Sequence, residues 1–111
     1  VTDQISNPSY IKDVTKSILQ CILMSYEGLL HIGSDNFISR YEFAIEIAKT
    51  FDLDQSLIEP ITTEKLIRNN INYNAKRPNH SGLNIEIIEK ELNLTTCTTL
   101  HSLKKIKSHI C

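Results

Sequence analysis

The stretch "SRYEFAIEIAKTF", residues 39–51, indicates where a helix begins and which face of that helix is apolar. Ser39 and Glu42 have the spacing of a capping box, in which the serine hydroxyl accepts from the Glu42 backbone N–H and the glutamate accepts from the serine N–H. Apolar side chains then recur with helical period, at Ala44, Ile47, Ala48 and Phe51. We therefore predict a helix that begins at Ser39 and ends before "DLDQS".

Two further elements are predicted before this helix. Residues 10–26 carry apolar side chains with helical period, and Gly28 follows as a stop signal. The apolar stripe that we expect to face the core consists of Ile11, Val14, Ile18, Leu19, Ile22, Leu23 and Tyr26. The run "LLHIGS", residues 29–34, is short, apolar and bounded by turn residues, which is typical of a buried strand.

The rest of the chain predicts three shorter helices and one long loop. The expected helix caps are Thr62 or Thr63, then Asn84, then Thr98 or Thr99. Residues 68–84 show no sustained period, and long loops inside compact domains are usually functional or disordered. This loop is therefore the first place to look for a site.

Length and composition exclude several classes of protein. A chain of 111 residues with 41% hydrophobic content can build one modest core, so we expect one domain. Its 12 basic and 13 acidic residues give a net charge of −1, which offers no field for a nucleic-acid backbone. No apolar run approaches the roughly 18 residues of a membrane span, and the first residues do not resemble a signal peptide. We expect a cytoplasmic protein with no nucleic-acid or membrane partner.

Familiar catalytic and metal-binding motifs are absent from the sequence. Cys97, His101, His109 and Cys111 lack the spacing of zinc ligands, so we predict no metal site. The chain has only three glycines, far apart, and they cannot form the loop that holds a dinucleotide. A nucleophile elbow and a phosphate-binding P-loop are also missing. We predict no catalytic residue in this chain.

The segment "KRPNHS", residues 76–81, is the strongest remaining candidate for binding. Arg77 has a forked cation that suits a diphosphate, and Pro78 stiffens the chain behind it. A solvated surface loop explains the same residues equally well, so the pattern alone leaves both readings open.

Four segments, taken in order, resemble the C-terminal region of the dTDP-4-dehydrorhamnose reductase family, within the extended short-chain dehydrogenases. They are "VTDQISNPSYIKDV", "GLLHIGSDNFISRYEFAIEIAKTFDLDQSLIEPITTEKL", "AKRPNHSGLN" and "IEKELNL". The resemblance covers essentially the whole chain. Its most specific pieces are Asp3-Gln4 followed by Pro8, the "SRYEF" helix start, and Arg77-Pro78 followed by Ser81.

The resemblance implies site residues for a nucleotide-sugar substrate. Arg77 matches an arginine that commonly meets the diphosphate in related enzymes, and Gln4, Pro8 and Ser9 lie in the segment that borders the pocket. Ser9 departs from the usual threonine but keeps the hydroxyl. The family's catalytic Tyr-x-x-x-Lys pair and its glycine-rich cofactor loop should precede this region, and neither is in this sequence.

The resemblance implies an α/β protein: residues 1–111 are a single, mostly helical, C-terminal substrate-binding domain whose one or two short strands would join a missing Rossmann half. The complete protein would reduce dTDP-4-keto-L-rhamnose to dTDP-L-rhamnose with NADPH or NADH, bound by that N-terminal half. Two alternatives stay open. One is a noncatalytic regulatory subunit, which resembles the beta subunit of methionine adenosyltransferase, and the other is a standalone interaction module. Homodimerisation is also left open.

Overall fold

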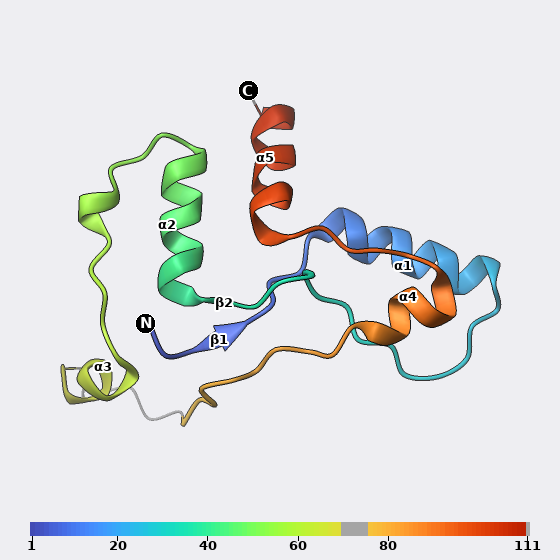
Figure 1. Cartoon of the computed structure of the whole chain (residues 1–111), viewed down its shortest axis with the longest axis horizontal. Helices are drawn as coiled ribbons and strands as arrows, with labels where there is room; N and C mark the ends of the chain where they lie inside the picture. Colours follow the sequence, from blue (N-terminus) through green and yellow to red (C-terminus); the bar gives the residue numbers. More distant parts are fainter. Residues whose placement is uncertain (70–75, 111) are drawn as a thin grey trace.

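The computed structural model describes residues 1–69 and 76–110, and these fold into helices arranged around a very small sheet (Figure 1). The elements in chain order are β1 Ile5–Ser6, α1 Ile11–Leu23, β2 Ile38–Ser39, α2 Arg40–Thr50, the 3-10 turn η1 Gln55–Leu57, α3 Thr63–Asn69, α4 Glu86–Leu92 and α5 Thr99–Ile110. The predicted class, mostly helical with one or two short strands, is confirmed.

Strand β1 is the centre of the arrangement. It pairs antiparallel with β2, so that Ile5 lies opposite Ser39, and it also forms a parallel bridge from Ile5 to His80. The Ile5 N–H donates to the Asn79 carbonyl at 2.7 Å, and the Ser81 N–H donates to the Ile5 carbonyl at 3.0 Å. Three segments that are distant in sequence therefore meet at β1.

Helix α2 begins as the sequence predicts. The Ser39 hydroxyl accepts from the Glu42 N–H at 3.1 Å, and the Glu42 carboxylate accepts from the Ser39 N–H at 2.9 Å, which completes the capping box. The helix packs against α5, and Ala48 and Leu103 are buried on these two helices. This pair of helices forms one part of the core.

Helix α1 buries a polar face, which is the opposite of the face predicted to be buried. Its buried residues are Asp13 and Ser17, whereas the apolar stripe is largely open, with Ile18 54% and Ile22 69% exposed. Asp13 accepts from the Cys97 N–H at 2.7 Å, and this bond holds the polar face inward, where the helix packs against α4. The expectation that the stripe faces this chain's own core is therefore wrong. The helix also ends at Leu23, earlier than predicted.

Residues 29–34 do not form the predicted strand. They run as irregular chain, Leu29 is 76% exposed, and no described segment gives backbone partners to residues 29–32. The segment is held by side chains instead: Ser9 donates to the Ile32 carbonyl at 2.9 Å, and Asn7 donates to the Ser34 carbonyl at 3.3 Å. Prediction of a strand fails here because a strand needs a neighbouring backbone.

Asn7 connects three segments in the interior. Besides its bond to Ser34, its amide nitrogen donates to the Leu83 carbonyl at 3.0 Å, and its amide oxygen accepts from the Leu83 N–H at 2.9 Å. Gly33 packs so closely here that a Cβ on it would lie 2.5 Å from the Asn7 amide nitrogen. A glycine is therefore needed at residue 33 for steric reasons.

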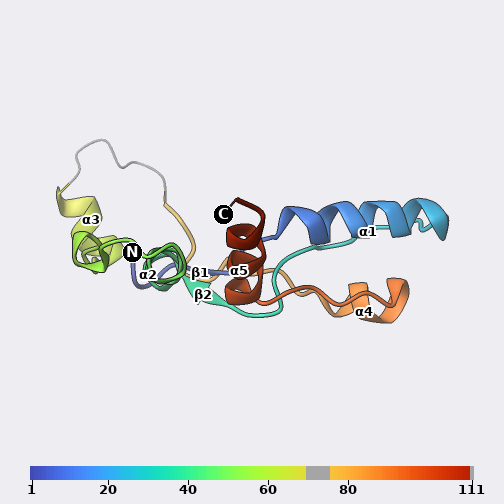
Figure 2. The ribbon, with the colours of Figure 1, turned by 90° about the horizontal axis from the view of Figure 1, so that it is seen from above.

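The chain as a whole is open and thin. Figure 2 shows α1 and α4 extending to one side of the small sheet and α3 lying at the other. The radius of gyration is 16.5 Å, whereas a compact chain of this length would have about 13 Å. In the described part, the buried apolar residues are Tyr10, Ala48, Ile88, Leu92 and Leu103. None of the described helices combines the length and apolar character needed to cross a bilayer.

Candidate functional site

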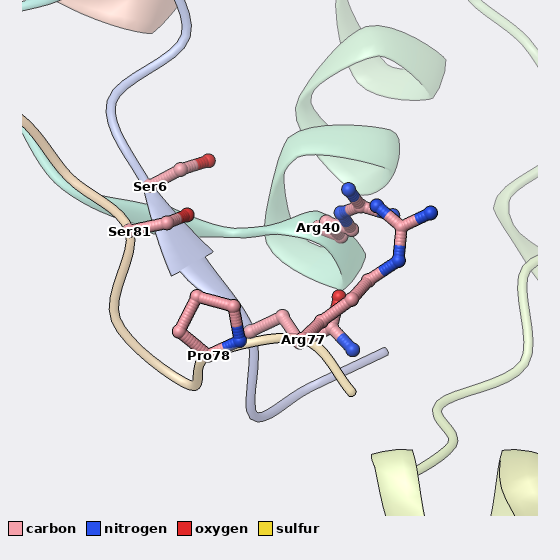
Figure 3. A pocket seen from close by; sticks show the side chains of 6 residues that line it. Ser6, Arg40, Arg77, Pro78 and Ser81 are labelled. Atoms are coloured by element: carbon pink, nitrogen blue, oxygen red, sulfur yellow. The ribbon is translucent and has the colours of Figure 1, made fainter. Parts of the chain in front are cut away.

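A pocket of about 200 Å³ lies beside β1, where the three segments meet (Figure 3). The described residues that line it are Gln4, Ser6, Arg40, Arg77, Pro78 and Ser81. They supply two guanidinium groups, two hydroxyls and an amide, and no carboxylate is among them. A pocket with this set of donors favours an anion that can accept several hydrogen bonds.

The backbone of β1 fixes both sides of the pocket. Arg77 and Pro78 come directly before the two hydrogen bonds that join residues 79–81 to Ile5. On the other side, Arg40 is the first residue of α2, and its N–H donates to the Gln4 carbonyl at 3.2 Å. The spacing of the two arginines is therefore set by sheet geometry and a capped helix rather than by a free loop.

Gln4 both lines the pocket and supports a neighbouring helix. It is 5% exposed, and its amide nitrogen donates to the Thr63 hydroxyl at 3.0 Å. Asp3 accepts from the Thr63 hydroxyl at 2.8 Å and from its N–H at 2.9 Å, and these bonds hold the pKa of Asp3 below its ordinary value. Asp3 and Gln4 together thus fasten the start of α3 to the wall of the pocket.

Of the four residues predicted from the sequence, the structure brings two together. Gln4 and Arg77 line the same pocket, whereas Pro8 and Ser9 line a second pocket of about 220 Å³, bounded mainly by apolar side chains of α1, α2 and α5. The Ser9 hydroxyl donates to the Ile32 carbonyl. A contact of Pro8 or Ser9 with substrate stays a prediction.

Arg40 is one of the pocket residues that the sequence reasoning did not select. One signal for it was present, because a cation at the first position of a helix lies at the positive end of the helix dipole. Such a placement is unfavourable for the helix itself, so it points to another use of the side chain. Ser6 carried no comparable signal.

A metal site has little support from the geometry. Among residues 1–69 and 76–110, no three histidine, cysteine, aspartate or glutamate side chains gather closely enough to hold an ion. Cys111, one of the candidate ligands considered from the sequence, lies outside the described residues. Cys21 and Cys97 are both free thiols.

The order and packing of the elements place the chain in a known class: it has the fold of the C-terminal part of an extended short-chain dehydrogenase. More specifically, the chain belongs to the family described as the RmlD substrate binding domain, which matches residues 1–110.

Several known proteins are similar to the chain. A dTDP-4-dehydrorhamnose reductase from Clostridium acetobutylicum ATCC 824 superposes with a TM-score of 0.82 and 28% identity over 99% of this chain and 37% of that protein. A dTDP-4-dehydrorhamnose reductase from Bacillus anthracis str. Ames, solved in complex with NADP, gives a TM-score of 0.82 with 23% identity over 99% and 36% of the two chains, which supports the fold alone.

A curated relative adds a link to polysaccharide synthesis. The spore coat polysaccharide biosynthesis protein SpsK of Bacillus subtilis (strain 168) is 32% identical over 93 residues, which are 81% of this chain and 29% of that protein. The chain therefore spans about a third of the length of the proteins that it resembles.

Proposed function

We propose that the chain is the substrate-binding part of a nucleotide-sugar reductase that converts dTDP-4-keto-L-rhamnose to dTDP-L-rhamnose. The observation that carries the proposal is the pocket beside β1, in which Arg77 faces a space lined by donors in a chain of the RmlD substrate binding family. Its guanidinium can give two parallel hydrogen bonds to a phosphate. Gln4, fixed by Thr63, offers an amide to the same ligand.

The chain's own residues bind and orient the substrate in this proposal. The bound cofactor, NADPH or NADH, would supply the hydride, but the three glycines of this sequence do not form a dinucleotide loop. The sequence also lacks the Tyr-x-x-x-Lys pair of the family. Arg77 holds the diphosphate end, which directs the sugar toward a reaction centre outside this chain.

A nucleotide-binding half is the partner that we propose for the open face of the chain. The apolar face of α1 is exposed along its length, at Ile11, Ile18, Leu19, Ile22 and Leu23. Next to it, residues 29–32 have no backbone hydrogen-bond partner among the described residues, as an edge strand would before it joins a sheet. A sheet-containing Rossmann half would cover both surfaces and would bring the cofactor to the substrate.

Arginine substitutions test the substrate-binding proposal. In the full natural polypeptide that contains these residues, Arg77→Ala should weaken binding of dTDP-L-rhamnose about ten- to a hundredfold, as expected for a lost hydrogen bond to a charged group. Arg77→Lys should recover only part of the affinity, because an ammonium cannot form the fork. Arg68→Ala is the matched control, since Arg68 pairs with Glu64 on an exposed face of α3.

Affinities are measured by calorimetric titration, and the outcomes separate the alternatives. Equal affinities for Arg77→Ala and Arg68→Ala would refute the role of Arg77. Tight binding of dTDP-L-rhamnose, with no oxidation of NADPH or NADH when dTDP-4-keto-L-rhamnose is supplied, would favour the noncatalytic regulatory alternative over the reductase.

A pair of leucine substitutions tests the proposed partner half. Leu23 of α1 is 70% exposed and Leu57 of η1 is 80% exposed in the described chain, so the two sites are alike before any partner is added. If α1 is covered, Leu23→Glu should destabilise the full natural polypeptide by about 2 kcal/mol, because a charge is then buried. Leu57→Glu should cost about 0.5 kcal/mol or less. Equal urea midpoints would show that α1 stays open.

A further inference from the structure

The two arginines of the pocket are mounted on opposite flanks of β1. Arg77 precedes the segment that bridges to β1 at His80, and Arg40 follows β2, which pairs with the other side of β1. In Figure 3 both side chains extend to the same side of the strand, and both line the one pocket. Two cations from separate elements therefore share one small space.

The nearby carboxylates are engaged with other groups. Asp3 accepts from Thr63, and Glu42 accepts from the Ser39 N–H in the capping box. The ion pairs among residues 1–69 and 76–110 join Lys49 to Glu46, Arg68 to Glu64, Lys90 to Glu86 and Lys107 to Asp52, and Arg40 is in none of them. The described part of the chain thus provides no counter-charge for Arg40, and a bound anion would supply it.

The charge of Arg40 is also unfavourable for helix α2. Its side chain is exposed, and at the first position of α2 its charge faces the positive end of the helix dipole. A residue kept for helix stability would be neutral or acidic there. The side chain is placed for the pocket rather than for the helix.

We propose that Arg40 is the second phosphate-binding residue of this pocket, so that Arg40 and Arg77 each hold one phosphate of a diphosphate. The inference rests on the proposed function, in which Arg77 meets the diphosphate of a nucleotide sugar. It adds that the pocket selects ligands that carry two anionic groups at the spacing of a diphosphate. A diphosphate can offer each guanidinium group a phosphate of its own, with a bidentate pair at each.

The test compares a ligand with two phosphates to one with a single phosphate. Inorganic pyrophosphate and inorganic phosphate are titrated calorimetrically into the full natural polypeptide and into Arg40→Gln, Arg77→Gln, the double variant and the control Arg68→Gln. We expect the unaltered protein to bind pyrophosphate about tenfold more tightly than phosphate. Arg40→Gln should lose about that tenfold preference, because one phosphate of pyrophosphate is then unpaired. Arg68→Gln should retain it.

Further measurements separate a binding role from a structural one. Arg40→Gln should unfold at the same temperature as the unaltered protein or slightly higher, since a cation leaves the positive end of α2. Arg40→Lys should restore part of the lost affinity. A titration with dTDP-L-rhamnose should show the same relative loss in Arg40→Gln, which distinguishes a nucleotide-sugar site from one for free pyrophosphate alone.

Three results would overturn the inference. In the first, Arg77→Gln loses pyrophosphate affinity and Arg40→Gln does not, so that Arg40 is excluded while the proposed function stands. In the second, neither substitution changes affinity, and both the inference and the proposed role of Arg77 fail. In the third, the unaltered protein binds phosphate and pyrophosphate equally, so that the pocket does not recognise a pair of phosphates.

Discussion

Replacing Asn7 should strongly destabilise the interior of the described chain. The side chain is 6% exposed and makes three hydrogen bonds to the backbone, one to Ser34 and two to Leu83. A hydrogen bond contributes about 1 kcal/mol net, and a buried group left without a partner costs about 1–3 kcal/mol. Ser34 is 2% exposed, so water cannot replace Asn7 as the partner of its carbonyl. Leu83 is 40% exposed, so water can replace Asn7 there.

These magnitudes give a graded expectation. Asn7→Ala should lower the free energy of unfolding by about 2–4 kcal/mol, a large part of the roughly 5–15 kcal/mol of a typical domain. Asn7→Asp keeps the size but replaces the NH₂ group with an oxygen that faces two carbonyl oxygens, so it should cost at least as much as alanine. Urea unfolding of the full natural polypeptide measures both, with the exposed Asn69→Ala as control. Unfolding energies within about 0.5 kcal/mol of the control would refute this account of Asn7.

Three further predictions concern the same framework. Ser39→Ala should cost about 1–2 kcal/mol in urea unfolding, because it removes the cap of α2; no change would mean that the capping box is not stabilising. Since Thr63 lowers the pKa of Asp3, the Asp3 carboxylate stabilises the fold above its ordinary pKa of about 4, and this stabilisation is lost as the pH falls below that value. Asp3→Asn should therefore flatten the loss of stability in acid, and an unchanged pH profile would contradict the bond to Thr63. Gly33→Ala should destabilise more than Gly82→Ala, because the added Cβ meets buried Asn7 at 2.5 Å in the first case and the 60% exposed Phe37 ring, which can swing away, in the second. Equal melting temperatures would contradict it.

Local hydrogen-bond chemistry was predictable from the sequence. The capping box of α2 was predicted at the right residue, and the cap of α5 is Thr98, whose hydroxyl accepts from the His101 N–H at 3.3 Å. The Asn84 side chain accepts from the Glu86 N–H at 2.9 Å just before α4, but the residue at the N-cap is Ile85, so the predicted cap lies one residue too early. Each of these signals lies within four residues, so the sequence contains both partners.

Burial and pairing between distant segments were not predictable in the same way. The period of α1 identifies an apolar face but not what that face meets, and here the chain's own interior takes the polar face through Asp13. The apolar run at residues 29–34 has the composition of a strand, but the described chain offers it no neighbouring backbone. Arg77 was a candidate from its own segment, and a resemblance favoured it and added Gln4. The place of Arg40 beside them depends on how β1 and β2 pair, which its position in the helix does not encode.

The fastening of α3 by Asp3 and Gln4 has a practical consequence for where this polypeptide can be cut. The Thr2 N–H donates to the Ile61 carbonyl at 2.9 Å, and the Val1 carbonyl accepts from the Tyr41 N–H at 3.0 Å, so the first four residues are bonded to two separate parts of the fold. A shortened version that starts at Ile5 would keep every helix and both strands in its sequence. It would nevertheless leave α3 untethered and one wall of the pocket missing, so a boundary chosen from secondary structure alone would cut through the site.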